Sequence, residues 1–119
     1  MEYVLLNYVN EGAFAALTKE QQEQGVAAYV SYMEALTKAG VLKGKNRLER
    51  SSSATTVRMT NGKAQVLDGP YADSKEQLGG LFVIDVPDLD AAISWAARCP
   101  AATHGVVEVR PLGNIPVAV

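Results

Sequence analysis

The sequence of 119 residues predicts an α+β sandwich, in which helices pack on a sheet of antiparallel strands. Three observations predict this fold class. Strand-like apolar runs occur near both ends and in the middle of the chain. Two segments between them repeat apolar residues at helical spacing. An Asn61-Gly62 pair, the preferred turn of a two-residue β-hairpin, separates two short alternating segments.

The first half of the chain predicts a strand, a helix and a second strand. Residues 2–9, EYVLLNYV, are typical of an inner strand because both faces are largely apolar. The helix begins at a capping box formed by Thr18 and Gln21 and ends at Gly40. A second strand is expected within residues 41–50. The predicted inward stripe of the helix consists of Val26, Tyr29, Val30, Met33 and Leu36.

The register of the hairpin follows from counting outward from Asn61-Gly62. Thr60 then faces Lys63, Met59 faces Ala64, and Val57 faces Val66. This register places the four apolar residues on one face, so the turn and the hydrophobic pattern agree.

The second half repeats the order of strand, helix and strand. Residues 80–86, GLFVIDV, are typical of a strand covered on both faces. Asp88 caps a helix that ends at Pro100, and residues 105–111 form the last strand. The predicted inward stripe of this helix consists of Leu89, Ala92, Ile93 and Ala96. The whole order predicts one domain over residues 1–119, a ferredoxin-like sandwich with an added β-hairpin.

This layout predicts a homodimer. Both helices cover the same face of the sheet, yet Leu81 and Val83 point away from the face of Phe82 and Ile84. A monomer would leave that second apolar face in water, and such patches usually mark an interface. The apolar tail at 114–119 also needs a surface to pack on.

Composition excludes several classes of protein. The formal charge is −2 with both signs interspersed, which argues against direct nucleic-acid binding. No apolar run reaches the roughly 18 residues of a membrane span, and the N-terminus lacks a basic leader region. Cys99 is the single cysteine, so an intrachain disulfide or a thiolate zinc cluster is not expected. We expect a cytoplasmic protein.

Four stretches together resemble the DGPF-motif branch of the YCII-related family. They are DGPY at 68–71, SKEQLGG at 74–80, PDLDAAISWAARCP at 87–100 and HGVVEVRPL at 104–112. The likeness extends along nearly the entire chain. Tyr71 stands where the motif has phenylalanine, and Asp73-Ser74 stand where the family typically has Glu-Thr.

The resemblance implies a dimeric α/β-barrel version of the ferredoxin-like fold. Some YCII-related members are thought to be enzymes that use a His-Asp pair in a cleft beside the sheet. Genes of the DGPF branch often lie beside, or are fused to, genes of extracytoplasmic-function sigma factors. The resemblance therefore implies a functional link to such a factor, although this chain contains no DNA-binding module.

Asp68 and His104 are the candidate catalytic residues. The Asp68 carboxylate either accepts backbone amides in an Asx turn or acts as a general acid or base. His104, the only histidine, titrates near neutrality but lies at the entry to the last strand, where a surface role is ordinary. A lone histidine without a cysteine cluster predicts no metal site.

The loop that follows Asp68 is the candidate rim of a ligand site. Ser74 with Gln77 predicts a capping box and a short helical turn that ends at Gly79-Gly80. Exposed charges there are either simply solvated or hold a small anion. The candidate ligand-binding residues are Tyr8, Tyr71, Lys75 and Glu76.

Three functions remain open from the sequence. The first is an enzyme of lyase, isomerase or hydrolase type that acts without a cofactor on a small organic substrate, with Asp68 and His104 as acid and base. The second is a module that binds a small ligand without turnover. The third is a structural dimer that partners another protein, such as a sigma factor. The distance between Asp68 and His104 discriminates between the first two.

Overall fold

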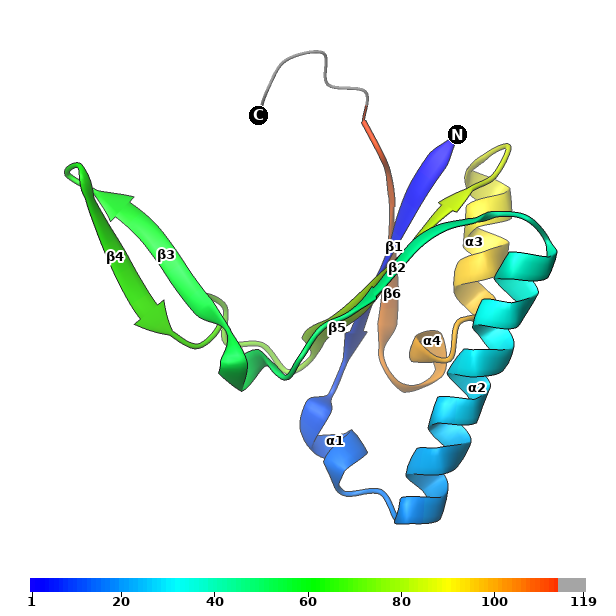
Figure 1. Cartoon of the computed structure of the whole chain (residues 1–119), viewed down its shortest axis with the longest axis horizontal. Coiled ribbons are helices and arrows are strands. Elements are labelled where there is room, and N and C mark those ends of the chain that lie inside the picture. Colours follow the sequence, from blue (N-terminus) through cyan, green and yellow to red (C-terminus); the bar gives the residue numbers. More distant parts are fainter. Residues whose placement is uncertain (114–119) are drawn as a thin grey trace.

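The structure is a computed structural model that describes residues 1–113 (Figure 1). The apolar tail at 114–119 lies outside these residues, and so does the prediction made for it.

A four-stranded antiparallel sheet forms the body of the protein. Its strands are β1 (Glu2–Val9), β2 (Leu42–Arg47), β5 (Gln77–Asp85) and β6 (Val106–Pro111), in the order β2-β5-β1-β6. The first and last strands of the chain are therefore neighbours, and β5 lies between β1 and β2. This order confirms the predicted ferredoxin-like topology.

Both long helices cover the same face of this sheet, as predicted (Figure 1). They are α2 (Lys19–Lys38) and α3 (Leu89–Arg98). The capping box of Thr18 and Gln21 is present, Gly40 has a positive φ of 74°, and Asp88 caps α3. Three short helices were not predicted: α1 (Glu11–Ala15), η1 (Ser51–Ser53) and α4 (Ala101–His104).

The core lies between the sheet and the two long helices. Tyr32 of α2 is at its centre, because its ring lies 5.4 Å from that of Phe82 and 6.3 Å from that of Trp95. Edge-to-face contacts of this kind are favourable aromatic geometries. The other large buried side chains are Tyr3, Leu5, Leu36 and Ile84.

The predicted inward stripes were wrong in part. Val26 and Val30 of α2 are 56% and 43% exposed, and Leu89 and Ile93 of α3 are 48% and 49% exposed. Tyr32, which the predicted stripe omitted, is buried against Phe82 and Trp95. On α3 the other two members of the predicted stripe, Ala92 and Ala96, are buried as predicted.

The hairpin is a separate two-stranded sheet formed by β3 (Thr55–Thr60) and β4 (Lys63–Asp68). Its predicted register is confirmed, since Val57 pairs with Val66 and Met59 with Ala64. We refer to residues 55–68 as the arm. Figure 1 shows that the arm projects away from the body, on the side of the sheet opposite α2 and α3.

The described chain is extended for its length. Its radius of gyration is 16.4 Å. A compact domain of this size is expected to measure about 13.5 Å. The excess comes from the projecting arm, which the body does not cover (Figure 1).

Candidate ligand site at the end of the sheet

One face of the sheet has no helix on it among the described residues. Along β1 the side chains alternate, so that Tyr3, Leu5 and Asn7 are buried beneath the helices. The alternate side chains are only half-buried and lie on the opposite side. We call this side the open face, and its central residues are Val4, Leu6, Tyr8, Leu81 and Val83.

Tyr8, Glu76 and Gly105 meet at one end of the sheet, where β1 ends and β5 and β6 begin. A Cβ atom built on Gly105 would lie only 2.0 Å from the Tyr8 carbonyl oxygen and 3.0 Å from Oε2 of Glu76. Glycine is therefore required for this close approach. The Glu76 carboxylate and the backbone carbonyl of Tyr8 consequently lie against the backbone directly after His104, while the Tyr8 side chain is on the open face.

His104 is exposed and is the last residue of α4. It makes no ion pair with Glu76 or with any other acid in residues 1–113. An exposed imidazole can donate or accept a hydrogen bond with the polar groups of a bound molecule.

A hydrogen-bonded clamp that the sequence did not predict surrounds this end of the sheet. The Glu11 carboxylate accepts hydrogen bonds from the backbone N–H and the Oγ of Ser51, both at 2.8 Å. The Glu11 amide donates to Oε1 of Gln77 at 3.2 Å. The partners are 40 and 66 residues apart in sequence, so no local pattern could have indicated them. The clamp joins α1, η1 and the start of β5.

The loop before β5 is not a helical turn, so that prediction was wrong. Ser74 donates from Oγ to the Glu76 carbonyl, and Nε2 of Gln77 donates to the Ser74 carbonyl, both at 2.6 Å. Strand β5 already begins at Gln77, because its backbone pairs with Val9. Lys75 is exposed and has no ion pair in the described chain.

Gly79 and Gly80 consequently lie inside β5 rather than at the end of a helix. Packing against β2 explains the glycine at position 80, since a Cβ there would lie 2.8 Å from the Asn46 carbonyl oxygen of β2.

Asp68 and Tyr71 lie in a second place, at the base of the arm. With Thr56, Arg58, Gln65, Leu67 and Pro70 they line a recess of about 160 Å³. Tyr71 is 82% exposed, and Asp68 is exposed as well.

The Asx turn predicted at Asp68 is not observed. The Asp68 carboxylate makes no hydrogen bond or ion pair with residues 1–113. Backbone and hydroxyl groups hold the turn instead. The Gly69 amide donates to the Ala54 carbonyl at 2.6 Å, and the Thr56 hydroxyl donates to the Gly69 carbonyl at 2.8 Å. Gly69 has a φ of 101°, which favours glycine, as predicted.

Asp68 and His104 do not come together within one copy of the chain. Asp68 ends β4 and His104 ends α4, and these two elements lie on opposite sides of the sheet (Figure 1). An acid–base pair of these two residues is therefore not formed within the protomer, and their catalytic role stays a prediction.

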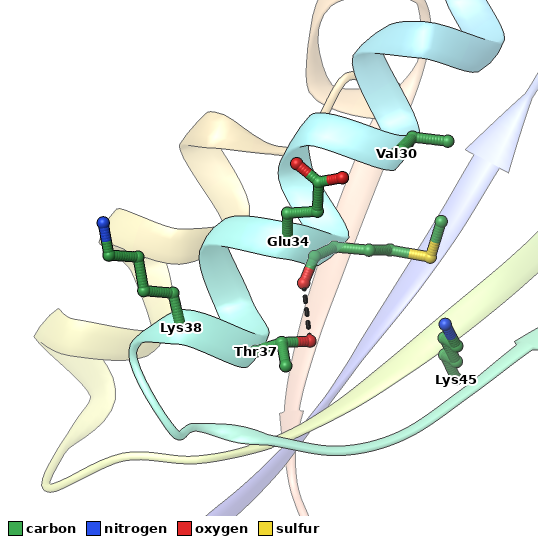
Figure 2. Close-up of a pocket in the computed structure, with 6 residues that line it drawn as sticks. Val30, Glu34, Thr37, Lys38 and Lys45 are labelled. Atoms are coloured by element: carbon green, nitrogen blue, oxygen red, sulfur yellow. Dashed lines mark hydrogen bonds between the residues drawn. The ribbon is translucent and has the colours of Figure 1, made fainter.

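A further open cleft, of about 380 Å³, lies between α2 and β2. Figure 2 shows Val30, Glu34, Thr37 and Lys38 on the helix, with Lys45 across from them on β2. The Thr37 hydroxyl is engaged with the Met33 carbonyl at 2.8 Å. No residue predicted as a site residue lines this cleft.

Cys99 is a buried side chain rather than a reactive thiol. Burial raises the pKa of its thiol, and its Sγ donates to Oδ1 of the buried Asn7 at 3.7 Å. A raised pKa lowers the thiolate fraction, which is the nucleophilic form. The described part of the chain has no cluster of three metal-ligating side chains and no helix long and apolar enough to cross a membrane.

The fold and this site define an α+β domain of ferredoxin-like topology, in which no helix of residues 1–113 covers one face of the sheet. The model of the YCII-related domain matches residues 1–115, so the chain belongs to the YCII-related family. An uncharacterised protein of Rhizobium meliloti (strain 1021) is 36% identical over 114 residues, which are 94% of this chain and 92% of that protein. The resemblance to the family is thereby confirmed, and the DGPF branch stays a prediction consistent with it.

A solved structure shares the fold. It is 5-chloro-2-hydroxyhydroquinone dehydrochlorinase (TftG) from Burkholderia phenoliruptrix AC1100, in complex with 2,5-dihydroxybenzoquinone. The TM-score is 0.55 at 15% sequence identity, over 95% of this chain and 94% of that one. A likeness at this identity concerns the fold alone.

Proposed function

We propose that this protein is a homodimer that binds a small planar organic molecule at the end of the sheet, in contact with Tyr8, Glu76 and His104. The observation that supports this site is the close approach at Gly105, which places the Glu76 carboxylate against the backbone beside Tyr8. A cytoplasmic location, predicted from the sequence, is part of the same proposal.

The three side chains suit a flat ligand with hydroxyl or carbonyl groups. The ring of Tyr8 offers an apolar face for stacking. The carboxylate of Glu76 accepts hydrogen bonds from hydroxyl groups, and His104 accepts or donates one. The structural neighbour was solved with 2,5-dihydroxybenzoquinone, a ligand of this chemistry, which makes that compound a suitable first probe.

The open face supports the homodimer. Its central residues are apolar, so contact with water costs free energy of the order of 25 cal/mol per Å² of apolar surface. The outer strands are protected against pairing edge to edge, because β2 presents Lys43, Lys45 and Arg47, and β6 ends at Pro111. Two copies therefore associate through their faces.

Catalysis is the second candidate function, and the neighbour's identity as a dehydrochlorinase favours it. The reaction would be of lyase, isomerase or hydrolase type without a cofactor, with Asp68 and His104 as acid and base. Binding ranks first because these two residues lie apart in one protomer. The functional link to a sigma factor, implied by the family resemblance, stays a prediction as well.

Calorimetric titration with 2,5-dihydroxybenzoquinone tests the binding site. We expect Glu76→Gln and Tyr8→Ala to weaken binding by about tenfold or more, since each change removes a direct contact. Glu34→Gln, which alters an exposed glutamate in the cleft on α2, is the matched control and should leave binding unchanged. Equal binding by Glu76→Gln and the wild type would refute the proposed site.

Turnover of the same probe tests the catalytic alternative. If Asp68 transfers a proton, Asp68→Asn should lose activity without losing stability, because the carboxylate makes no hydrogen bond within the described chain. An active Asp68→Asn variant would exclude this role.

Sedimentation equilibrium tests the dimer. Val83→Lys places a charge on the open face, and we expect it to produce monomers. Val30→Lys is the control on the helix-covered side, where the side chain is already 43% exposed. A wild-type protein that is monomeric at micromolar concentration would overturn the homodimer.

A further inference from the structure

The arm has two chemically different faces. Residues that pair directly across a hairpin share a face, so Val57, Val66, Met59 and Ala64 lie together. The other face contains the pairs Thr60–Lys63 and Arg58–Gln65 and, at the base of the arm, Thr56–Leu67, so it is polar except for Leu67. Alternation of this kind is typical of a strand with one buried and one solvated face.

The apolar face of the arm is nevertheless not covered by any segment within residues 1–113. Val57, Met59 and Val66 are 61%, 63% and 60% exposed. No residue of β3 or β4 belongs to the hydrophobic core, and none of the partly buried side chains packed on that core comes from the arm. A lone two-stranded hairpin is marginally stable in water, so this face needs a surface to pack on.

The base of the arm is fixed in position. Besides the hydrogen bond from the Gly69 amide to Ala54, the Thr56 hydroxyl donates to the Gly69 carbonyl at 2.8 Å. Pro70 follows directly and restricts the backbone. A surface held in place before association loses less conformational entropy on binding.

The position of the arm indicates what covers it. The arm leaves the body on the open-face side of the sheet, away from α2 and α3 (Figure 1). A second copy seated on the open face is therefore beside the arm. Under two-fold symmetry the same contact forms twice, so one association covers both open faces and both arms.

We propose that the arm is a clasp, whose Val57–Met59–Ala64–Val66 face packs on the second copy of the chain. This inference rests on the homodimer proposed above and adds to it the surface that holds the two copies together. The Arg58–Gln65 face stays in solvent. The extended shape of the protomer, with its radius of gyration of 16.4 Å, is then the shape of one half of a compact dimer.

Two pairs of neighbouring substitutions test the clasp. Val66→Arg and Met59→Lys place a charge on the apolar face. Gln65→Arg and Thr60→Lys place the same charge one residue away, on the opposite face. Sedimentation equilibrium gives the dimer dissociation constant of each variant, and circular dichroism shows that each retains its fold.

We expect Val66→Arg and Met59→Lys to raise the dimer dissociation constant by about tenfold or more, and the two controls to leave it within about twofold. If the wild type is a dimer and Val66→Arg and Gln65→Arg change its dissociation constant equally, the clasp is refuted. The proposed homodimer is not affected by that result.

Two other results would overturn the inference in different ways. A monomeric wild type would refute the clasp together with the homodimer. In the second, the wild type is a monomer, and Val66→Arg lowers its stability while Gln65→Arg does not. The apolar face would then pack on another segment of the same chain, such as residues 114–119, instead of a second copy.

Discussion

Gly105 shows how single residues define the end of the sheet. Its Cα lies so close to β1 that a Cβ would overlap the Tyr8 carbonyl oxygen at 2.0 Å. Gly25, in the middle of α2, is different, because a Cβ there would meet only Cε2 of Phe14 at an ordinary 3.9 Å. The same substitution should therefore have opposite effects at the two positions.

We expect Gly105→Ala to lower the free energy of unfolding by about 1–3 kcal/mol, as overpacking does, and to displace Glu76 from its position beside Tyr8. Gly25→Ala should raise the free energy of unfolding by about 0.5–1 kcal/mol, because glycine is a poor residue in a helix interior. Urea unfolding of both variants measures the difference. Equal stability of the two alanine variants would contradict the close approach.

At the scale of elements, α2 and α3 are joined by a hydrogen bond as well as by apolar contact. The Tyr32 hydroxyl donates to the Trp95 carbonyl at 2.7 Å, and the Arg98 guanidinium stacks over the Trp95 ring at 4.4 Å. The Tyr29 hydroxyl, on the same helix, makes no hydrogen bond with the described residues. Substitution of Tyr29 is therefore the matched control for substitution of Tyr32.

Tyr32→Phe should lower the free energy of unfolding by about 0.5–1.5 kcal/mol, the usual net value of one hydrogen bond. Tyr29→Phe should change it little at neutral pH. Thermal melts at pH 7 distinguish the two variants. A Tyr32→Phe variant as stable as the wild type would show that the bond between the helices contributes nothing.

The same tyrosines predict how stability depends on alkaline pH. Burial, with a smaller effect of Cys99, raises the pKa of Tyr29 to about 12, and burial raises the pKa of Tyr32 as well. The folded state therefore keeps protons that the unfolded chain releases near pH 10. The contribution of these protonated tyrosines to the free energy of unfolding is complete below about pH 10. It is lost as the pH rises through their pKa in the folded state.

Tyr29→Phe should accordingly reduce the fall in stability between about pH 10 and pH 12, because a group that titrates differently in the two states is gone. Denaturant unfolding at several pH values, beside the wild type, measures this slope. If Tyr29→Phe and the wild type lost stability equally between about pH 10 and pH 12, the titration of Tyr29 would not be the cause of the slope.

At the scale of the whole molecule, the arm and the body are structurally separate. The hydrophobic core contains no residue from 43–81, so the arm adds nothing to it. The two ends of the arm are close together, since the Gly69 amide lies 2.6 Å from the Ala54 carbonyl oxygen. A short linker can therefore replace the arm without moving the sheet.

Replacing residues 55–68 with a Gly-Gly linker should leave a body that unfolds cooperatively, with unchanged helical circular dichroism, because its core is intact. It should also weaken dimerisation if the arm is a clasp. Loss of cooperative unfolding would show instead that the body depends on the arm for its own stability.

Local patterns in the sequence predicted most of the fold and part of the site. The Thr18–Gln21 capping box, the Asn61-Gly62 turn and the left-handed Gly40 each depend on residues within a few positions of one another, and all three are confirmed. The Gly69 turn was also predicted, although its hydrogen bonds were assigned to the wrong partner.

What depends on distant residues could not be read from the sequence. Three features join segments that are far apart in the chain: the clamp between Glu11 and Ser51, the close approach of Gly105 to Tyr8, and the packing of Tyr32 on Phe82 and Trp95.

The sequence by itself thus determined the order of the main-sheet strands and the two long helices, most of their caps and turns, and the family, because propensity, periodicity and turn chemistry act over short stretches. Only the tertiary structure decided that Glu76 lies beside Tyr8 while Asp68 lies apart from His104, and that the arm leaves the body on the open-face side. The direction in which the chain leaves a loop, and the surfaces that then meet, depend on how the whole core packs. No local sequence pattern specifies that packing.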